Sequence, residues 1–117
     1  MTWSGLDQRA FPRLSARCDI AIHDRLFSQG LEAKTQNVGV GGVCVILDQA
    51  LEKLSQVRLR LTLNESEKPF ECDGRVVWMV RSKEPASGKV SFDTGIEFLN
   101  LTPQNQARVE HFIQNLI

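Results

Sequence analysis

The chain is organised around the stretch Asn37-Val38-Gly39-Val40-Gly41-Gly42-Val43-Cys44-Val45, in which a glycine-dense turn runs into an apolar segment. Three glycines within four positions require either a positive φ or the close approach of another group. Ordering these glycines costs conformational entropy, so a favourable interaction must offset it. Two explanations are open at this point: a ligand held by backbone N–H groups, or a tight hairpin or β-bulge.

Outside this stretch, apolar and polar residues alternate along most of the chain, which is the period of a half-buried β-strand. The clearest example is the segment 56–63, in which Val57, Leu59, Leu61 and Leu63 alternate with polar residues. Further strands are predicted at residues 15–27, 31–36, 43–47, 70–81 and 89–99, with turns at Gly30 and residues 84–88. Gly74 indicates a bulge or bend within its strand.

The end of the chain predicts a helix. Thr102-Pro103 supplies a hydroxyl cap followed by proline at the first helical position. Val109, Phe112, Ile113 and Leu116 then form one apolar stripe, which is expected to pack on the sheet. About six strands at hairpin spacing and one terminal helix indicate a mainly β fold, an antiparallel sheet curled into a small barrel.

The composition excludes several classes of partner. The 117 residues correspond to a single domain, and 14 basic and 14 acidic side chains give no net charge. The molecule as a whole therefore attracts neither nucleic acid nor an anionic membrane, and any anion site must be local. No apolar run reaches the roughly 18 residues of a membrane span, and residues 1–9 lack the apolar part of a signal peptide, which favours a cytoplasmic protein.

The sequence contains no recognisable pattern for catalysis or metal binding. Nucleophile-elbow, zinc-protease and P-loop motifs are all missing. His23 has no second metal-binding side chain at a useful spacing. Cys18, Cys44 and Cys72 are odd in number and widely spaced, which predicts buried free thiols. We therefore expect a protein that is not an enzyme and has no metal or cofactor.

Two arginines four positions apart, Arg9 and Arg13, precede the first predicted strand. With this pair and the later Asn37-x-Gly39-x-x-Gly42, the chain resembles the PilZ domain family, whose paired motifs are R-x-x-x-R and [D/N]-x-S-x-x-G. The likeness extends over most of the chain. Residues 74–78 resemble the G-x-V-x-W strand of the family, and residues 94–101 resemble its G-[IV]-x-F-x-x-L segment.

The resemblance implies a six-stranded antiparallel, Greek-key-like β-barrel with a C-terminal helix, which binds the bacterial second messenger cyclic di-GMP. It divides the chain into a flexible arm, residues 1–14, and a barrel domain, residues 15–117. A guanidinium fork matches phosphate oxygens and the O6/N7 edge of guanine, so Arg9 and Arg13 are expected to clamp the ligand against the barrel. Asn37 would bind a guanine edge or order the turn, and Gly42 would permit close backbone approach.

Gly39 departs from the family, which has serine at this position. A lost hydroxyl contact costs about 0.5–1.5 kcal/mol, whereas each bidentate arginine–guanine contact contributes about 1–3 kcal/mol, so we expect weakened binding. Two functions stay open. One is a receptor that orders its arm on binding and signals to an unidentified protein partner. The other is an interaction module of the same fold that does not bind nucleotide. Trp3 and Trp78 are interpreted as packing residues.

Overall fold

A computed structural model of the chain describes residues 13–24 and 27–116. The elements in chain order are β1 (Arg13–Ser15), β2 (Asp19–Asp24), β3 (Phe27–Gly39), β4 (Gly42–Leu47), β5 (Gln56–Thr62), β6 (Phe70–Lys83), β7 (Val90–Leu99) and α2 (Pro103–Leu116). Most of the predicted arm, with Arg9 and Trp3, lies outside the described residues. Within the described ranges, no helix has the length and apolar character needed to cross a membrane.

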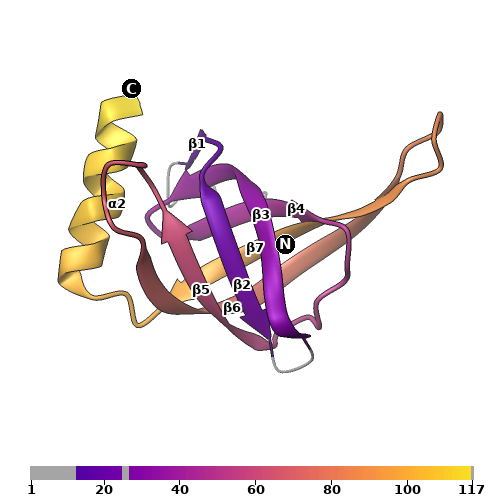
Figure 1. Cartoon of the computed structure of the whole chain (residues 1–117), viewed down its shortest axis with the longest axis horizontal. Helices are drawn as coiled ribbons and strands as arrows, with labels where there is room; N and C mark the ends of the chain where they lie inside the picture. Colours follow the sequence, from indigo (N-terminus) through magenta and orange to yellow (C-terminus); the bar gives the residue numbers. More distant parts are fainter. Residues whose placement is uncertain (1–12, 25–26, 117) are drawn as a thin grey trace.

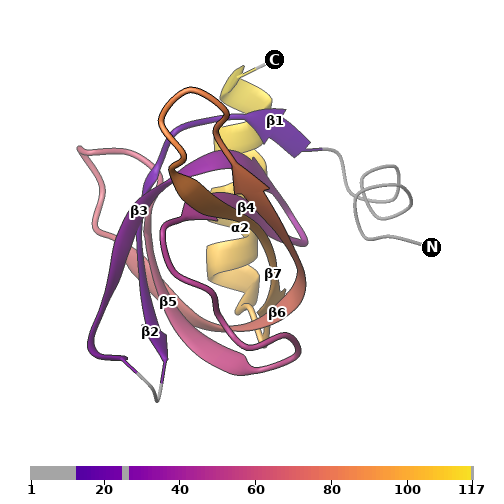
Figure 2. The same cartoon turned by 90° about the vertical axis from the view of Figure 1, so that its right-hand side faces the viewer.

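The strands form one antiparallel sheet that closes on itself. Its order is β1-β3-β2-β5-β6-β7-β4, and β4 pairs again with β3. Strands β2 to β7 therefore enclose a barrel, which Figure 2 shows nearly end on. β1 and β2 follow one another along the same edge of β3. The predicted mainly β fold, a six-stranded antiparallel barrel with a C-terminal helix, is confirmed.

Alternation along the strands fills the barrel. On β5, Val57, Leu59 and Leu61 are buried while Arg58 and Arg60 face solvent, as predicted. All three cysteines are buried and none forms a disulfide, as predicted. The buried core is made of inward residues of the strands, three residues of the connections (Cys18, Leu51 and Leu63) and two residues of α2. Its strand and helix members are Ile20, Ile22, Val38, Val43, Val45, Leu47, Val57, Leu59, Leu61, Phe70, Cys72, Val76, Ile96, Val109 and Ile113.

The helix α2 begins where the sequence predicts it. The Thr102 hydroxyl oxygen accepts a hydrogen bond from the backbone N–H of Asn105 at 3.1 Å, as an N-cap does. Val109 and Ile113 enter the core, whereas Leu116 is 46% exposed, so the apolar stripe is buried only in part. Figure 1 shows α2 at one end of the molecule and the tip of the β6–β7 hairpin at the other.

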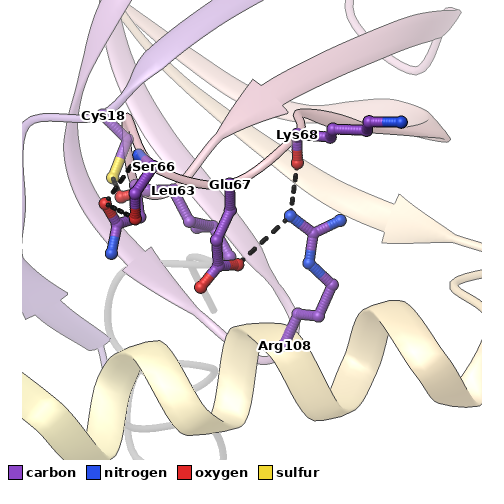
Figure 3. A network of polar contacts seen from close by, with 7 residues as sticks. Cys18, Leu63, Ser66, Glu67, Lys68 and Arg108 are labelled. Atoms are coloured by element: carbon purple, nitrogen blue, oxygen red, sulfur yellow. Dashed lines mark hydrogen bonds and ion pairs between the residues drawn. The ribbon is translucent and has the colours of Figure 1, made fainter.

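Arg108 fastens α2 to the loop between β5 and β6 (Figure 3). Its guanidinium donates hydrogen bonds to the backbone carbonyl of Lys68 and, at 3.3 Å, to the carboxylate of Glu67. The same group lies over the ring of Phe70, 5.5 Å from the ring centroid. One side chain thereby joins the helix, the loop and the first residue of β6.

Two glycines do not have the positions in the fold that the sequence predicts. Gly30 lies inside β3 with a φ of 74°, rather than at a turn. Gly74 pairs regularly with Val57 and with Phe98, so the predicted bulge is not at this residue. A Cβ at Gly74 would stand 2.8 Å from the side chains of Leu59 and Ile96. Close packing inside the barrel is therefore what requires glycine there.

Candidate functional site

The glycine stretch forms a tight hairpin between β3 and β4. Asn37 to Gly39 end β3 and Gly42 begins β4, so the connection consists of Val40 and Gly41. Among the described glycines, positive φ occurs at Gly30 and Gly88, outside this stretch. A Cβ at Gly42 would lie 2.2 Å from the backbone oxygen of Ile96 and 2.9 Å from the Cα of Glu97. Close approach therefore explains Gly42, and the approaching group is the backbone of β7.

Strand β1 brings the arginine motif to this hairpin. Arg13 pairs with Gly39, Leu14 with Val38 and Ser15 with Asn37, in antiparallel register. The two motifs, which are separated by two dozen residues in the sequence, therefore meet on one ladder. Arg9 lies outside the described residues, and residues 13–14 of the predicted arm already belong to a strand.

A bulge in β3 turns Asn37 to the outside of the barrel. Thr35 pairs with Val45 and Asn37 with Cys44, so β3 carries one extra residue, Gln36, between these pairs. Val43 and Val45 belong to the core, so Cys44 between them faces outward, and so does its partner Asn37. Without the extra residue, Asn37 would point into the barrel like Thr35.

A second bulge, in β6, turns Trp78 outward in the same way. Val76 pairs with Ile96 and Trp78 with Gly95, so Val77 is the extra residue. Gly95 also pairs with the outward-facing Cys44, which places Trp78 on the same side. The indole lies directly on Gly95, because a Cβ there would stand 2.2 Å from Trp78 Nε1. Trp78 is thus a packing residue, as interpreted, but it packs on the outer surface.

Asn37, Cys44, Gly95 and Trp78 form one row across strands β3, β4, β7 and β6, which we call the outer row. Asn37 Oδ1 and Trp78 Nε1 are buried and have no hydrogen-bond partner among the described residues. Buried polar atoms are normally paired, and each unpaired one costs about 1–3 kcal/mol. An unpaired acceptor and an unpaired donor at the two ends of the outer row are suited to a polar ligand.

The outer row carries no charged side chain of its own, so a charged ligand would need cations from its neighbours. On one side, the next outward pair along β6 and β7 is Arg75 and Glu97, whose charged groups lie 3.8 Å apart and are partly exposed. On the other side, it is Val80 and Asp93, which adds a carboxylate. On the β1 side, the neighbouring ladder carries Arg13. Positive charge at the site therefore comes chiefly from the arginine motif.

The structure thus brings together Asn37, Gly39, Gly42 and the backbone of Arg13, among the residues that the sequence predicts for the site. It adds Trp78, Gly95 and Cys44, which sequence reasoning did not assign to a site. The sequence does hold one signal for them, a tryptophan and a glycine in two strands expected to be neighbours. That signal has meaning only once the register between the strands is known.

The sequence profile of the PilZ domain matches residues 7–115. No curated protein is significantly similar to the chain. Similar solved structures include the inhibitor of motility MotI/DgrA of Bacillus subtilis, with 20% identity and a TM-score of 0.72 over 93% of this chain and 51% of that one. The PilZ domain of Escherichia coli YcgR with c-di-GMP has 16% identity and a TM-score of 0.75, over 93% and 91% of the two chains.

The PilZ domain of CeSA from a cellulose-synthesizing bacterium has 13% identity and a TM-score of 0.59, over 89% and 96% of the two chains. The chain therefore spans about half the length of MotI/DgrA and most of the YcgR and CeSA domains. At these identities, the structural likeness shows a shared fold. Because the family profile covers nearly the whole sequence, the chain belongs to the PilZ domain family.

Proposed function

We propose that this protein is a non-catalytic receptor module for cyclic di-GMP, which binds outside the barrel between the arginine motif and the outer row. The observation that carries the proposal is the pairing of Arg13 with Gly39, at the hairpin that follows Asn37. The similar PilZ domain of YcgR is described with c-di-GMP, which supports the choice of ligand.

The chemistry of the ligand suits the residues. Cyclic di-GMP offers two phosphate anions and two guanines, and the guanidinium forks of Arg9 and Arg13 match both kinds of group. The unpaired Asn37 Oδ1 accepts a hydrogen bond from an N–H on a guanine edge. At the other end of the outer row, the Trp78 indole offers a face for stacking a base and an N–H for an acceptor oxygen.

Calorimetric titration with cyclic di-GMP tests the proposal. We expect saturable heat with the wild-type protein and none with Arg13→Ala. Arg13→Lys is the matched control, since lysine keeps the charge but loses the fork, so weak binding is expected to survive. Gly39→Ser restores the hydroxyl of the family motif and is expected to tighten binding up to about tenfold. A folded wild-type protein that releases no heat would contradict the receptor proposal.

Gly39 is the observation that favours a second function, an interaction module that has lost nucleotide recognition. Absence of heat with both the wild-type protein and Gly39→Ser would support this alternative. Heat with Gly39→Ser alone would show that the missing hydroxyl decides between the two functions.

Signalling to a protein partner is the second part of the receptor proposal. Binding would order the residues around Arg9 and Arg13, and so change the surface that a partner meets. Hydrogen exchange of residues 1–15, with and without cyclic di-GMP, measures this directly. We expect slower exchange in the presence of the nucleotide, and unchanged exchange despite saturable binding would exclude the arm as the responding element.

A further inference from the structure

The far halves of β6 and β7, residues 79–94, form a ribbon whose end projects from the molecule in Figure 1. Residues 92–94 of this ribbon still pair with β4, and residues 82–91 are two-stranded. Their mutual pairing extends to Lys83 and Val90. The pairing of β5 with β6 ends at Arg75, and the pairing of β4 with β7 ends at Phe92. At the tip of the ribbon, β6 and β7 therefore pair with each other and with no other described strand.

One edge of this ribbon is free over half of β6. Beyond Arg75, the last described backbone hydrogen bonds on the outer edge of β6 are those of Val76 with Leu54 and Ser55. Residues 77–83 have no strand beside them on that edge in the part of the chain that the structure describes. A free edge of this length presents unpaired N–H and C=O groups to any extended segment.

The side chains along the free edge have a definite charge pattern. Arg81 and Lys83 point to one face of the ribbon, are exposed, and form no ion pair with any described residue. Their partners across the ladder on that face, Phe92 and Val90, are apolar. Of the acidic residues in the ribbon, Asp93 lies on the opposite face and Glu84 lies at the turn. This face is therefore cationic and apolar, with no acid.

The opposite face of the same edge is apolar at its centre. Val80 is 54% exposed there and lies between Trp78 and Ser82. A strand added to the edge would place alternate side chains on the two faces. Its residues on the first face would meet Arg81 and Lys83, and its residues on the second face would meet Val80.

We infer that the free edge of β6 binds an extended segment of a partner protein by strand addition, and that this segment alternates acidic and apolar side chains. In this mode, backbone hydrogen bonds supply affinity and alternate side chains supply specificity. A second copy of this chain fits less well, because its own free edge carries the same cations and no acid. The inference does not depend on nucleotide binding, although Trp78 of the outer row lies at the root of the same edge.

Two synthetic peptides test the inference, one alternating glutamate and valine and the other alternating lysine and valine. With the isotope-labelled protein, the acidic peptide is expected to shift NMR signals of residues 77–83 saturably and to slow the exchange of their amides. The basic peptide is expected to bind at least about tenfold more weakly, because like charges oppose it at two positions. The doubly reversed variant Arg81→Glu with Lys83→Glu is expected to exchange these preferences.

Both substitutions lie on the exposed ribbon, so the thermal midpoint is expected to stay unchanged, which separates lost binding from lost folding. Equal affinity for the two peptides, shifts on another surface, or no saturable shift with either peptide would overturn the inference. So would a dimer of the free protein in light scattering that the reversed variant abolishes, because the second copy would then be the occupant.

Discussion

Two regions of the barrel differ in the regularity of their strand pairing and in the pairing of their polar side chains. One region is β5 together with the stretches of β2 and β6 that pair with it, which we call the β5 wall. Its two ladders have no register shift. The outward-facing Arg58 there lies close to both Asp73 and Glu71. The outer row has a bulge at each end and two buried polar atoms without a partner among the described residues.

The difference indicates where stability and binding reside. A bulge gives up ladder hydrogen bonds and re-aims a side chain, and bulges are frequent next to functional sites. The bulges in the β3–β4 and β6–β7 ladders re-aim Asn37 and Trp78, which lie at the two ends of the outer row. We therefore expect substitutions in the β5 wall to change the free energy of unfolding, and substitutions in the outer row to change affinity for cyclic di-GMP.

Leu59→Ala is the strongest test of the β5 wall. Leu59 is fully buried at the centre of β5, so its truncation leaves a cavity and is expected to lower the free energy of unfolding by about 2–5 kcal/mol. Urea denaturation measures the loss. Leu54→Ala is the matched control, because Leu54 is 65% exposed and its truncation should cost less than about 0.5 kcal/mol. Affinity of the folded Leu59→Ala protein below its transition should equal that of the wild type.

Trp78→Phe is the corresponding test of the outer row. The indole N–H has no described partner, so its removal relieves the cost of an unpaired donor. This gain offsets the packing lost with the smaller ring, and stability is expected to fall by no more than about 0.5 kcal/mol. The ring face is retained while the donor is lost, and we expect affinity for cyclic di-GMP to fall about tenfold.

Val80→Ala is the control for Trp78→Phe, since Val80 faces the same side of β6 one pair further along. It should change neither stability nor affinity for the nucleotide. If Trp78→Phe lowered stability and left affinity unchanged, Trp78 would be a packing residue only, and the outer row would lose its proposed role.

The outward direction of Trp78 also shows what the sequence can and cannot predict. Alternation identifies β5, and the cap at Thr102 identifies the start of α2, because both features are local. Along β6, alternation places Gly74, Val76 and Trp78 on one face. The extra residue at Val77 ends that pattern, and nothing in a local window reveals an extra residue. The glycine that suggested a bulge, Gly74, instead makes room for Leu59 and Ile96.

The motif residues of the candidate site could be named from the sequence, but the other members of the outer row could not. Asn37, Gly39 and Arg13 could be named because a motif is a pattern within the sequence itself. That Arg13 lies opposite Gly39 depends on the pairing of β1 with β3. The outer row depends on three further ladders, so its members become visible only when the barrel has closed.

A smaller effect, on the free energy of unfolding at alkaline pH, is expected from the buried Cys72 of the β5 wall. Cys72 pairs with Leu59 and is buried, and burial raises the pKa of its thiol from 9.0 to about 11. The unfolded chain therefore loses this proton at a lower pH than the folded protein. The resulting contribution to stability is complete below pH 9.0 and is lost as pH rises towards about 11.

Cys72→Ala removes this contribution, so the difference in pH dependence between the wild type and the variant measures it. The variant is expected to be less stable at pH 8 because of the cavity, and to lose less stability than the wild type between pH 8 and 10.5 (roughly the span of the two pKa values). Urea denaturation at both pH values measures the two slopes. Equal slopes would show that Cys72 does not titrate differently in the folded and unfolded states.

The smallest effect is expected from Arg58→Ala, on the solvent face of the β5 wall. Arg58 donates a hydrogen bond to Asp73 at 3.0 Å, which raises the pKa of the guanidinium, and lies 3.6 Å from Glu71. Its side chain is half exposed, so solvent screens both interactions and the loss should stay below about 1 kcal/mol.

Arg60→Ala is the matched control for Arg58→Ala, because Arg60 also faces solvent on β5 and has no ion pair with a described residue. The difference in unfolding free energy between the two variants should shrink as salt is raised from about 0.01 M to 1 M, since the charges are then screened within a few ångströms. Affinity for cyclic di-GMP should be unchanged in both. A lower affinity in Arg58→Ala alone would extend the binding surface across the barrel, because Arg58 lies two pairs along the β5–β6 ladder from Arg75 and further still from Trp78.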